Sequence, residues 1–144
     1  MIAKRCRPLI LYERMIDKIA WIYLSEGYLL SSRSRGRKKY YIPGGKREAG
    51  EQDFDTLYRE ILEECNVNLL PGSIKFVGSF QAQADGHIEG LKVQMTCYSA
   101  EYDGVLSPGA EIEELIWLTH ADIPYVSPVD QLIIRSLNQQ GLML

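Results

Sequence analysis

The chain has 144 residues, and we expect one domain with its own hydrophobic core over residues 1–144. A net charge of −3 argues against general attraction to nucleic acid. No apolar stretch approaches the roughly 20 residues of a membrane span, and the run at 9–12 is too short for a signal peptide. Three scattered cysteines suit a reducing cytoplasm, and two distant histidines argue against a zinc site. We expect no membrane partner, and a monomer or homodimer.

The first half of the chain predicts a buried hairpin followed by a basic loop. The apolar runs 19–24 and 28–30 are separated by Ser25-Glu26-Gly27, which is typical of a turn between two strands. Residues 33–39 read RSRGRKK and predict a solvated basic loop. A short strand over 40–43 then leads into a glycine-rich turn at Gly44-Gly45.

A helix is predicted to begin at Asp53, as its N-cap, and to run to Cys65. An acidic residue at 55 is favourable in the first turn of a helix. The apolar residues Leu57, Ile61 and Cys65 follow one another at intervals of four, so they form one buried stripe. The glutamates of the helix lie on the opposite face.

The second half predicts three more strands and a final helix. Strands are expected over 74–80, 93–100 and 115–118, with a polar loop over 81–90. Ser127 and Pro128 predict a helix start with an acidic capping partner at Asp130, and Gly141 ends the helix. Strands with two interspersed helices predict an α/β fold of the α+β type, with a mixed sheet covered on both faces. The expected apolar stripe of the last helix is Val129, Leu132, Ile133 and Leu137.

Three glutamates of the first predicted helix lie close together. Glu60, Glu63 and Glu64 stand at i, i+3 and i+4, so they share one face, which we expect to be solvent-exposed. Like charges at this spacing repel each other and destabilise a solvated helix. A hard divalent cation removes the repulsion, and Mg2+ prefers carboxylate oxygens. The segment therefore predicts a metal site, to which the glycine-rich turn brings backbone atoms.

The same segment resembles the Nudix box, G-x5-E-x7-R-E-U-x-E-E-x-G-U, where U is aliphatic. Only Asn66 departs from the pattern, since the family has glycine there. We expect Asn66 to follow the helix end in the left-handed conformation, which asparagine adopts more readily than most residues. The other required positions are filled by Gly45, Glu51, Arg59-Glu60-Ile61, Glu63-Glu64 and Val67.

The resemblance implies an α/β/α sandwich with a mixed sheet between helices, and an Mg2+ cofactor for which Mn2+ can substitute. In similar proteins two or three of the box glutamates bind the metal, together with a backbone carbonyl of the glycine pair. The implied ligands here are Gly44, Gly45, Glu60, Glu63 and Glu64. A salt bridge between Glu51 and Arg59 is expected to hold the loop against the helix.

The resemblance also implies catalytic roles for Glu60, Glu63 and Glu64, and for Glu111 as an outlying candidate. Nudix enzymes often bring a further carboxylate to the metal or the attacking water from the loop in which Glu111 lies. The alternative is that Glu111, Glu113 and Glu114 form a solvated acidic loop. Whether Glu60 or Glu111 is the general base stays open.

Two residues are candidates for substrate binding. Arg33, at the end of an apolar strand, is the best candidate in the basic loop for a phosphate contact. Tyr41 could stack on a base, although aromatic residues in strands are usually part of the core.

The expected activity is Mg2+-dependent hydrolysis of the diphosphate linkage of a nucleoside diphosphate derivative. Markers of the ADP-ribose and oxidised-guanine branches are missing, which favours a nucleoside triphosphate pyrophosphatase. The alternatives are an enzyme acting on ADP-sugars or other diphosphate-linked metabolites, a ligand sensor without turnover, and an isoprenoid diphosphate isomerase. A sensor usually loses box glutamates, and the isomerase needs an active-site cysteine that Cys65 and Cys97 do not obviously supply.

Overall fold

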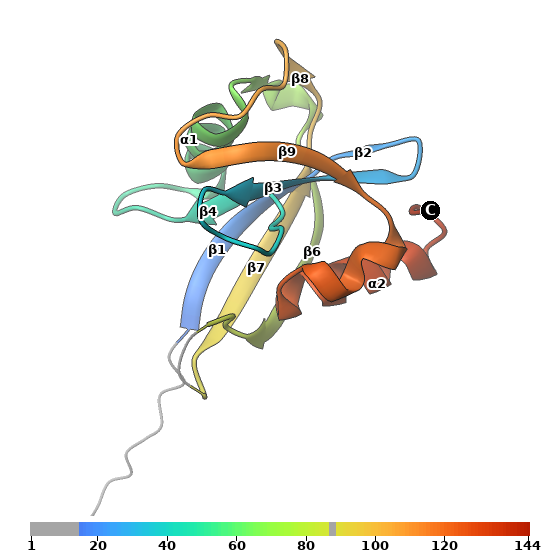
Figure 1. Ribbon diagram of the computed structural model, residues 1–144. Helices are drawn as coiled ribbons and strands as arrows, with labels where there is room; N and C mark the ends of the chain where they lie inside the picture. The colour runs from blue at the N-terminus through green and yellow to red at the C-terminus, as the bar shows by residue number, and fades with distance from the viewer. Residues whose placement is uncertain (1–14, 87–88) are drawn as a thin grey trace, which may run out of the picture.

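The computed structural model describes residues 15–86 and 89–144 (Figure 1). Neither of the two α-helices in this part is long and apolar enough to cross a membrane. The helices are α1 (Asp53–Cys65) and α2 (Pro128–Gln139), with short 3-10 helices at Pro71–Ser73 and His120–Tyr125. The strands are β1 (Met15–Ile22), β2 (Leu24–Ser25), β3 (Tyr28–Ser34), β4 (Gly44–Lys46), β5 (Asn68–Leu69), β6 (Lys75–Gln83), β7 (Lys92–Ser99), β8 (Tyr102–Asp103) and β9 (Ile112–Leu118).

The largest sheet of the described chain is mixed and has the strand order β4-β1-β7-β6. Strands β1 and β7 pair in parallel along their whole length, whereas β4 and β6 pair antiparallel at the two edges. A second, antiparallel sheet has the order β2-β3-β9, and β5 pairs with β8.

Strand β1 separates two hydrophobic cores because its side chains alternate between two faces. Ala20 and Ile22 belong to the core that contains the buried residues of α2, whereas Ile19 and Trp21 belong to the core beneath α1. The two helices therefore cover opposite faces of the central sheet (Figure 1). This confirms the predicted α/β/α sandwich.

Strand boundaries differ from the predictions where long-range pairing decides the structure. The apolar run 19–24 is divided, because β1 ends at Ile22 and only β2 forms a hairpin with β3. Strand β6 continues into the predicted polar loop as far as Gln83. The predicted turn at Gly44-Gly45 is strand β4, and the residues before it, Tyr40 and Tyr41, form only isolated bridges.

Helix α1 has the predicted length and buried stripe, but its N-cap is Gln52 and not Asp53. The Asp53 carboxylate instead bonds to Arg47 and to the Tyr98 hydroxyl. Asp55 completes the capping arrangement by accepting a hydrogen bond of 3.0 Å from the Gln52 N–H. Asp55 thus lies in the first turn of the helix, as expected. Asp53 does not cap the helix, because its carboxylate binds Arg47 and Tyr98 instead.

Helix α2 begins at Pro128 after Ser127, as predicted, but two residues on it face differently. Leu132, which was expected in the buried stripe, is 40% exposed, and Ile134 is fully buried. Asp130 is also fully buried and does not cap the helix, because its Oδ2 atom accepts a hydrogen bond of 2.9 Å from the Ile42 N–H. Asp130, which the sequence suggested as a capping partner, therefore binds the backbone of the segment that precedes β4.

Asp130 is an unfavourably placed charge. Burial raises the pKa of Asp130 to about 7, with a smaller contribution from Asp85, while the hydrogen bond from Ile42 and the charge of Lys18 oppose the rise. The pKa of an unfolded aspartate is about 3.9. The folded state therefore keeps its proton to higher pH than the unfolded state, so this residue lowers the free energy of unfolding as pH rises from about 4 to about 7.

We expect Asp130→Asn to remove this pH-dependent loss. The asparagine has no charge to desolvate, and its side-chain oxygen can still accept from Ile42. In urea unfolding across pH 4 to 7, the variant should gain stability relative to wild type as pH rises. Asp103→Asn, at an exposed position in β8, is the control and should follow wild type. Parallel stability curves for Asp130→Asn and wild type would show that Asp130 ionises normally.

Candidate active site

Strand β4 brings backbone into direct contact with both β1 and α1. Gly44 has a φ of +150°, and a Cβ atom there would lie 2.1 Å from the Ile19 carbonyl oxygen. A Cβ atom on Gly45 would lie 2.3 Å from the carboxylate carbon of Glu60. The backbone of β1 therefore leaves no room for a side chain on Gly44, whereas a side chain on Gly45 would displace the Glu60 carboxylate.

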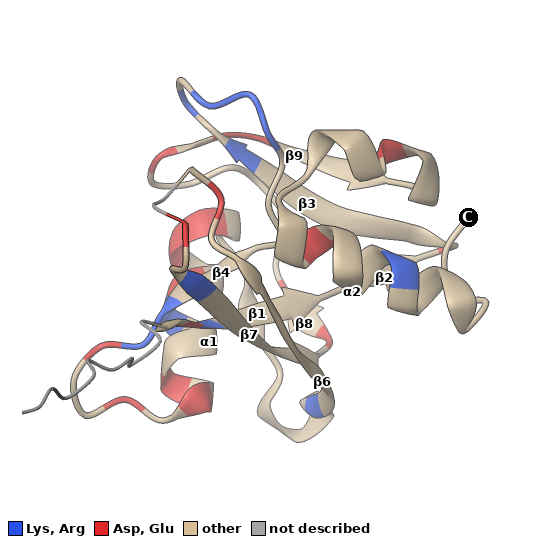
Figure 2. Ribbon diagram, turned by 90° about the horizontal axis from the view of Figure 1, so that it is seen from below, with Lys and Arg blue, Asp and Glu red and all other residues tan. Residues whose placement is uncertain are grey.

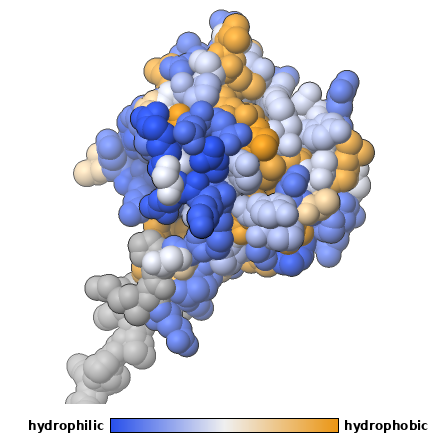
Figure 3. All heavy atoms as spheres, viewed as in Figure 1, coloured by the Kyte–Doolittle hydropathy of each residue, from blue (hydrophilic) through white to orange (hydrophobic). Residues whose placement is uncertain are grey.

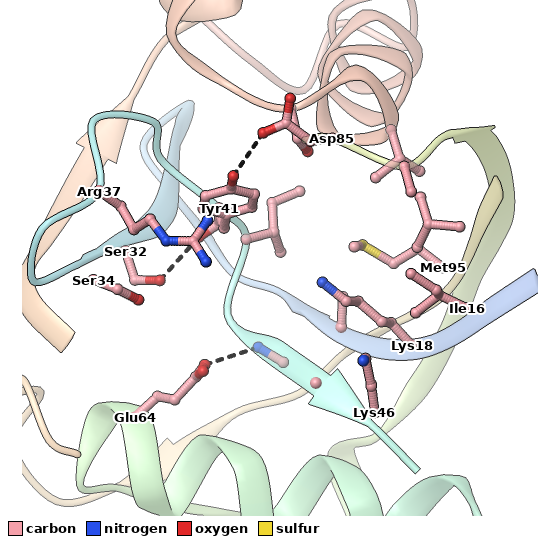
Figure 4. A pocket seen from close by; sticks show the side chains of 18 of the residues that line it. Ile16, Lys18, Ser32, Ser34, Arg37, Tyr41, Lys46, Glu64, Asp85 and Met95 are labelled. Atoms are coloured by element: carbon pink, nitrogen blue, oxygen red, sulfur yellow. Dashed lines mark hydrogen bonds between the residues drawn. The ribbon is translucent and has the colours of Figure 1, made fainter. Parts of the chain in front are cut away.

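Glu64 points from α1 towards β4, where its Oε1 atom accepts a hydrogen bond of 3.0 Å from the Gly44 N–H (Figure 4). It is only 9% exposed, so the expectation of a solvent-facing carboxylate is wrong for this residue. Burial raises the pKa of Glu64 to about 8, and the negative charges of Glu60 and Glu111 act in the same direction. Lys18 opposes the rise. Glu64 is thus a buried carboxyl group among other acids.

Glu60 and Glu63 both form ion pairs with the Arg59 guanidinium. Nη1 of Arg59 is 2.9 Å from Glu60 Oε1 and 3.5 Å from Glu63 Oε1. Burial raises the pKa of Glu60, helped by the charges of Glu63 and Glu111 and opposed by Arg59. The Glu63 side chain is 49% exposed. The three box glutamates therefore range from a buried carboxyl to one in contact with solvent.

The structure contains the expected ion pair between Glu51 and Arg59. Arg59 Nε donates to Glu51 Oε2 over 2.7 Å, and Nη2 donates to Oε1 over 2.9 Å. Nη2 also donates to the Lys46 carbonyl oxygen, which ties the helix to β4. Hydrogen bonds from Arg59 come first among the contacts that lower the pKa of Glu51 to about 2. This two-pronged contact fixes the orientation of the guanidinium beside Glu60.

Glu111 lies in the loop before β9 and lines the same cavity as Glu64. Its charge raises the pKa of both Glu60 and Glu64. The structure therefore brings Glu111 to the box glutamates across a long stretch of sequence. Glu113 and Glu114 are not among the residues that line this cavity. Both form ion pairs with Arg33 instead.

The donor chemistry of this cluster fits a hard divalent cation. Among the described residues, no three His, Cys, Asp or Glu side chains already form a ready metal-binding group. The charge of Glu111 nevertheless raises the pKa of both Glu60 and Glu64, and a bound cation relieves that repulsion. Carboxylate oxygens and backbone carbonyls are the donors that Mg2+ accepts.

A cavity of about 460 Å3 opens beside this cluster. Glu64, Glu111 and the glycine pair lie on its acidic side, and Figure 4 shows Lys18 and Lys46 near β4. Much of the remaining wall is apolar. It comes largely from β1, β7 and α2 and includes Ile16, Ala20, Ile42, Val93, Met95 and Val129.

The basic loop after β3 reaches the cavity, but with different arginines from the one predicted. Arg33 is not among the described residues that line the cavity, and its Nη2 lies 2.6 Å from Glu114 and 2.7 Å from Glu113. Arg35 and Arg37 line the cavity instead. Figure 2 shows basic residues along the loop after β3, and Figure 3 shows a strongly hydrophilic surface on this side of the molecule. The geometry therefore gives no support to Arg33 as a phosphate ligand.

Tyr41 lines the cavity, as a substrate contact requires. Its hydroxyl donates a hydrogen bond of 2.7 Å to Asp85 (Figure 4). Asp85 also pairs with Lys39 over 2.7 Å. Burial raises the pKa of Tyr41 to about 12, so the phenol stays protonated at neutral pH. The Tyr41 ring is thus held in place at the cavity wall.

Sequence reasoning missed the contribution of β1 and β7 to the site. Lys18 shares a face of β1 with Ile16 and Ala20, and all three line the cavity. Lys18 directly precedes the predicted apolar run 19–24, and a lysine at the start of a buried strand is a signal that could have identified it. Met95 carries no comparable signal, because one apolar residue in a buried strand resembles the next.

Comparison with known proteins agrees with this architecture. The family model for the NUDIX domain matches residues 16–137. The solved structure of the Escherichia coli ORF135 protein is similar, with 21% identity, coverage of 89% of this chain and 91% of that chain, and a TM-score of 0.69. A MutT NUDIX hydrolase from Burkholderia pseudomallei gives 18% identity, coverage of 85% and 98%, and a TM-score of 0.71.

A MutT protein from Methanosarcina mazei Go1 is also similar, at 18% identity, 92% and 99% coverage and a TM-score of 0.71. At these identities the structural likeness concerns the fold. Comparison with curated protein sequences gives no match. The family model spans most of the chain, including the segment from Gly45 to Val67. The chain therefore belongs to the Nudix hydrolase family.

Proposed function

We propose that this Nudix pyrophosphohydrolase acts with Mg2+ on nucleoside diphosphate derivatives, and that nucleoside triphosphates are its substrates. The observation that carries the proposal is the position of Glu64. Its buried carboxyl group is held by the Gly44 N–H at the edge of a cavity of about 460 Å3, beside Glu60 and Glu111. This volume lies within the usual range for small-molecule sites.

The distribution of charge around the cavity supports a substrate that carries phosphates. The cationic residues Lys18, Lys46, Arg35 and Arg37 line it together with the acids Glu64, Asp85 and Glu111. Cationic side chains stabilise phosphate oxygens, and the guanidinium fork matches them well. The apolar wall from β1, β7 and α2 offers a separate surface for a base or sugar.

The roles proposed for individual residues combine the Nudix-box pattern with the contacts in the structure. Glu60, Glu63, Glu64 and a carbonyl of Gly44 or Gly45 would hold Mg2+. When bound, the metal polarises phosphoryl oxygens and lowers the pKa of bound water. The Gly44 N–H orients Glu64, and Arg59 orients Glu60. A carboxylate, Glu60 or Glu111, accepts the proton of the attacking water.

The two other classes of function have less support. A sensor without turnover does not need the full set of box glutamates, and this chain retains all of them. An isomerase would need a reactive cysteine, but the two cysteines in the described part of the chain, Cys65 and Cys97, are fully buried in the two cores. Burial raises the pKa of each thiol to about 12, so both are poor nucleophiles.

The substrate class can be tested with a panel of nucleoside triphosphates, ADP-ribose and ADP-sugars in the presence of Mg2+. We expect the highest kcat/KM on a triphosphate, with a nucleoside monophosphate and pyrophosphate as products. Products should be identified by mass spectrometry, with a Glu64→Gln protein as the background control. A clear preference for ADP-sugars would contradict the triphosphate assignment and leave the hydrolase class intact.

Glu64→Gln should lower kcat by on the order of a hundredfold or more, because the ligand and its charge are lost together. The variant should remain folded, since glutamine keeps an oxygen that can accept from Gly44 and removes a carboxyl buried among like charges. Steady-state kinetics and urea unfolding measure the two effects.

Glu113→Gln is the matched control, because Glu113 is 49% exposed and pairs with Arg33 outside the cavity. Its kcat should stay within about threefold of wild type, as expected for a solvated surface pair. Equal losses in the two variants, or full activity in Glu64→Gln, would refute the assignment of the site.

A further inference from the structure

The C-terminal end of α1 is bonded to the loop that carries Glu111. The Ser107 N–H donates to the Cys65 carbonyl oxygen over 3.1 Å, and the Gly109 N–H donates to that of Glu64 over 3.0 Å. The last carbonyls of a helix have no partner within the helix. The loop supplies those partners here, so it is seated on the end of the helix that bears the box glutamates.

The Asn66 side chain adds a second connection to this loop. Its Nδ2 atom lies 3.1 Å from the Ser107 carbonyl oxygen, 3.2 Å from Ser107 Oγ and 3.2 Å from the Pro108 carbonyl oxygen. Carbonyl oxygens only accept hydrogen bonds, so the amide nitrogen must face the loop. Asn66 therefore donates to the backbone of two successive loop residues.

Asn66 also has the left-handed conformation, with φ 58° and ψ 31°, in which Nudix boxes carry glycine. Glycine would adopt this conformation more easily than asparagine but has no side chain with which to donate to the loop. Asparagine at position 66 therefore adopts the left-handed conformation less easily than glycine would, but it gains hydrogen bonds to the loop.

The loop leaves little free space around this contact. A Cβ atom on Gly109 would lie 2.3 Å from the Glu63 carbonyl oxygen and 3.0 Å from Asn66 Nδ2. On its other side, Arg35 Nη2 donates to the Ala110 carbonyl oxygen and the Arg35 N–H to that of Glu111, each over 2.9 Å. The short segment 107–111, which ends at Glu111, is thus held by α1 on one side and by Arg35 on the other.

We propose that Asn66 is a positioning residue, whose side-chain amide fixes the 107–111 loop to α1 and so holds Glu111 beside Glu64 for the reaction. The inference rests on the proposed role of Glu111 as a base or metal ligand. It concerns a residue that lies outside the cavity and contacts neither reacting group directly.

The test compares Asn66→Gly and Asn66→Asp with wild type on the best substrate of the panel. Asn66→Gly keeps the left-handed conformation and removes the donors. Asn66→Asp keeps the size and places oxygens against the loop carbonyls. We expect both to lower kcat by about tenfold with KM within about twofold, because small displacements of a reacting group slow the chemical step. Urea unfolding should show no loss of stability for Asn66→Gly.

Two further measurements separate positioning from a general structural effect. In a Glu111→Gln background, Asn66→Gly should lower kcat by less than about twofold, because the group that it positions is already absent. Hydrogen exchange should be faster in Asn66→Gly at the amides of Ser107, Gly109 and Ile112, and unchanged in β7.

Full multiplication of the two losses, or wild-type kcat and exchange in Asn66→Gly, would overturn the proposal. A Glu111→Gln enzyme with wild-type kcat would also overturn it, because there would be no reacting group to position. Failure of the triphosphate assignment is seen separately, since it changes only which substrate of the panel the wild type prefers.

Discussion

The hydrogen bond from the Gly44 N–H to Glu64 Oε1 is the contact on which the rest of the site depends. It joins an edge strand of the central sheet to helix α1 at a point where the backbone of β1 excludes a side chain on Gly44, and where a side chain on Gly45 would displace the Glu60 carboxylate. Because β4 is so short, this contact and its pairing with β1 determine where its backbone lies. The Arg59 guanidinium supports the same junction, by bonding to Glu51, Glu60 and the Lys46 carbonyl oxygen.

This junction gathers negative charge at the expense of stability. Glu60 is partly buried and Glu64 is largely buried. Burial raises the pKa of both residues, because it disfavours the charged carboxylate when no positive partner is present. Arg59 stabilises Glu60, whereas Glu64 has a single backbone donor and the more distant charge of Lys18. Such strain within an acidic cluster is expected at a site built to hold a cation.

The sequence predicts most of α1 correctly because the helix and its box depend on local spacing. The buried stripe of Leu57, Ile61 and Cys65 and the left-handed Asn66 both occur as expected. Strand β4 was predicted as a turn, because glycine has no strand propensity and only pairing with β1 makes the segment extended. Its contacts come from parts of the chain that local patterns do not relate.

Charged residues were harder to assign than apolar ones, for the same reason. Arg33 lies opposite Glu114 in the register between β3 and β9, and no feature of the RSRGRKK segment indicates that pairing. Asp130 occupies a position suited to a helix cap, and only the folded chain brings the Ile42 N–H to it. The apolar patterns predict which face of an element is buried, but long-range pairing decides which partner a buried charge meets.

The most direct measurement is a crystal structure of the protein at saturating Mn2+, with the ion located by its anomalous scattering. We predict an ion within about 2.0 to 2.4 Å of carboxylate oxygens from Glu60, Glu64 or both, in contact with the backbone of β4. Crystals of Glu64→Gln treated in the same way should show weaker density or none at that position. An ion bound elsewhere, with the glutamate face of α1 empty at saturating metal, would contradict the account.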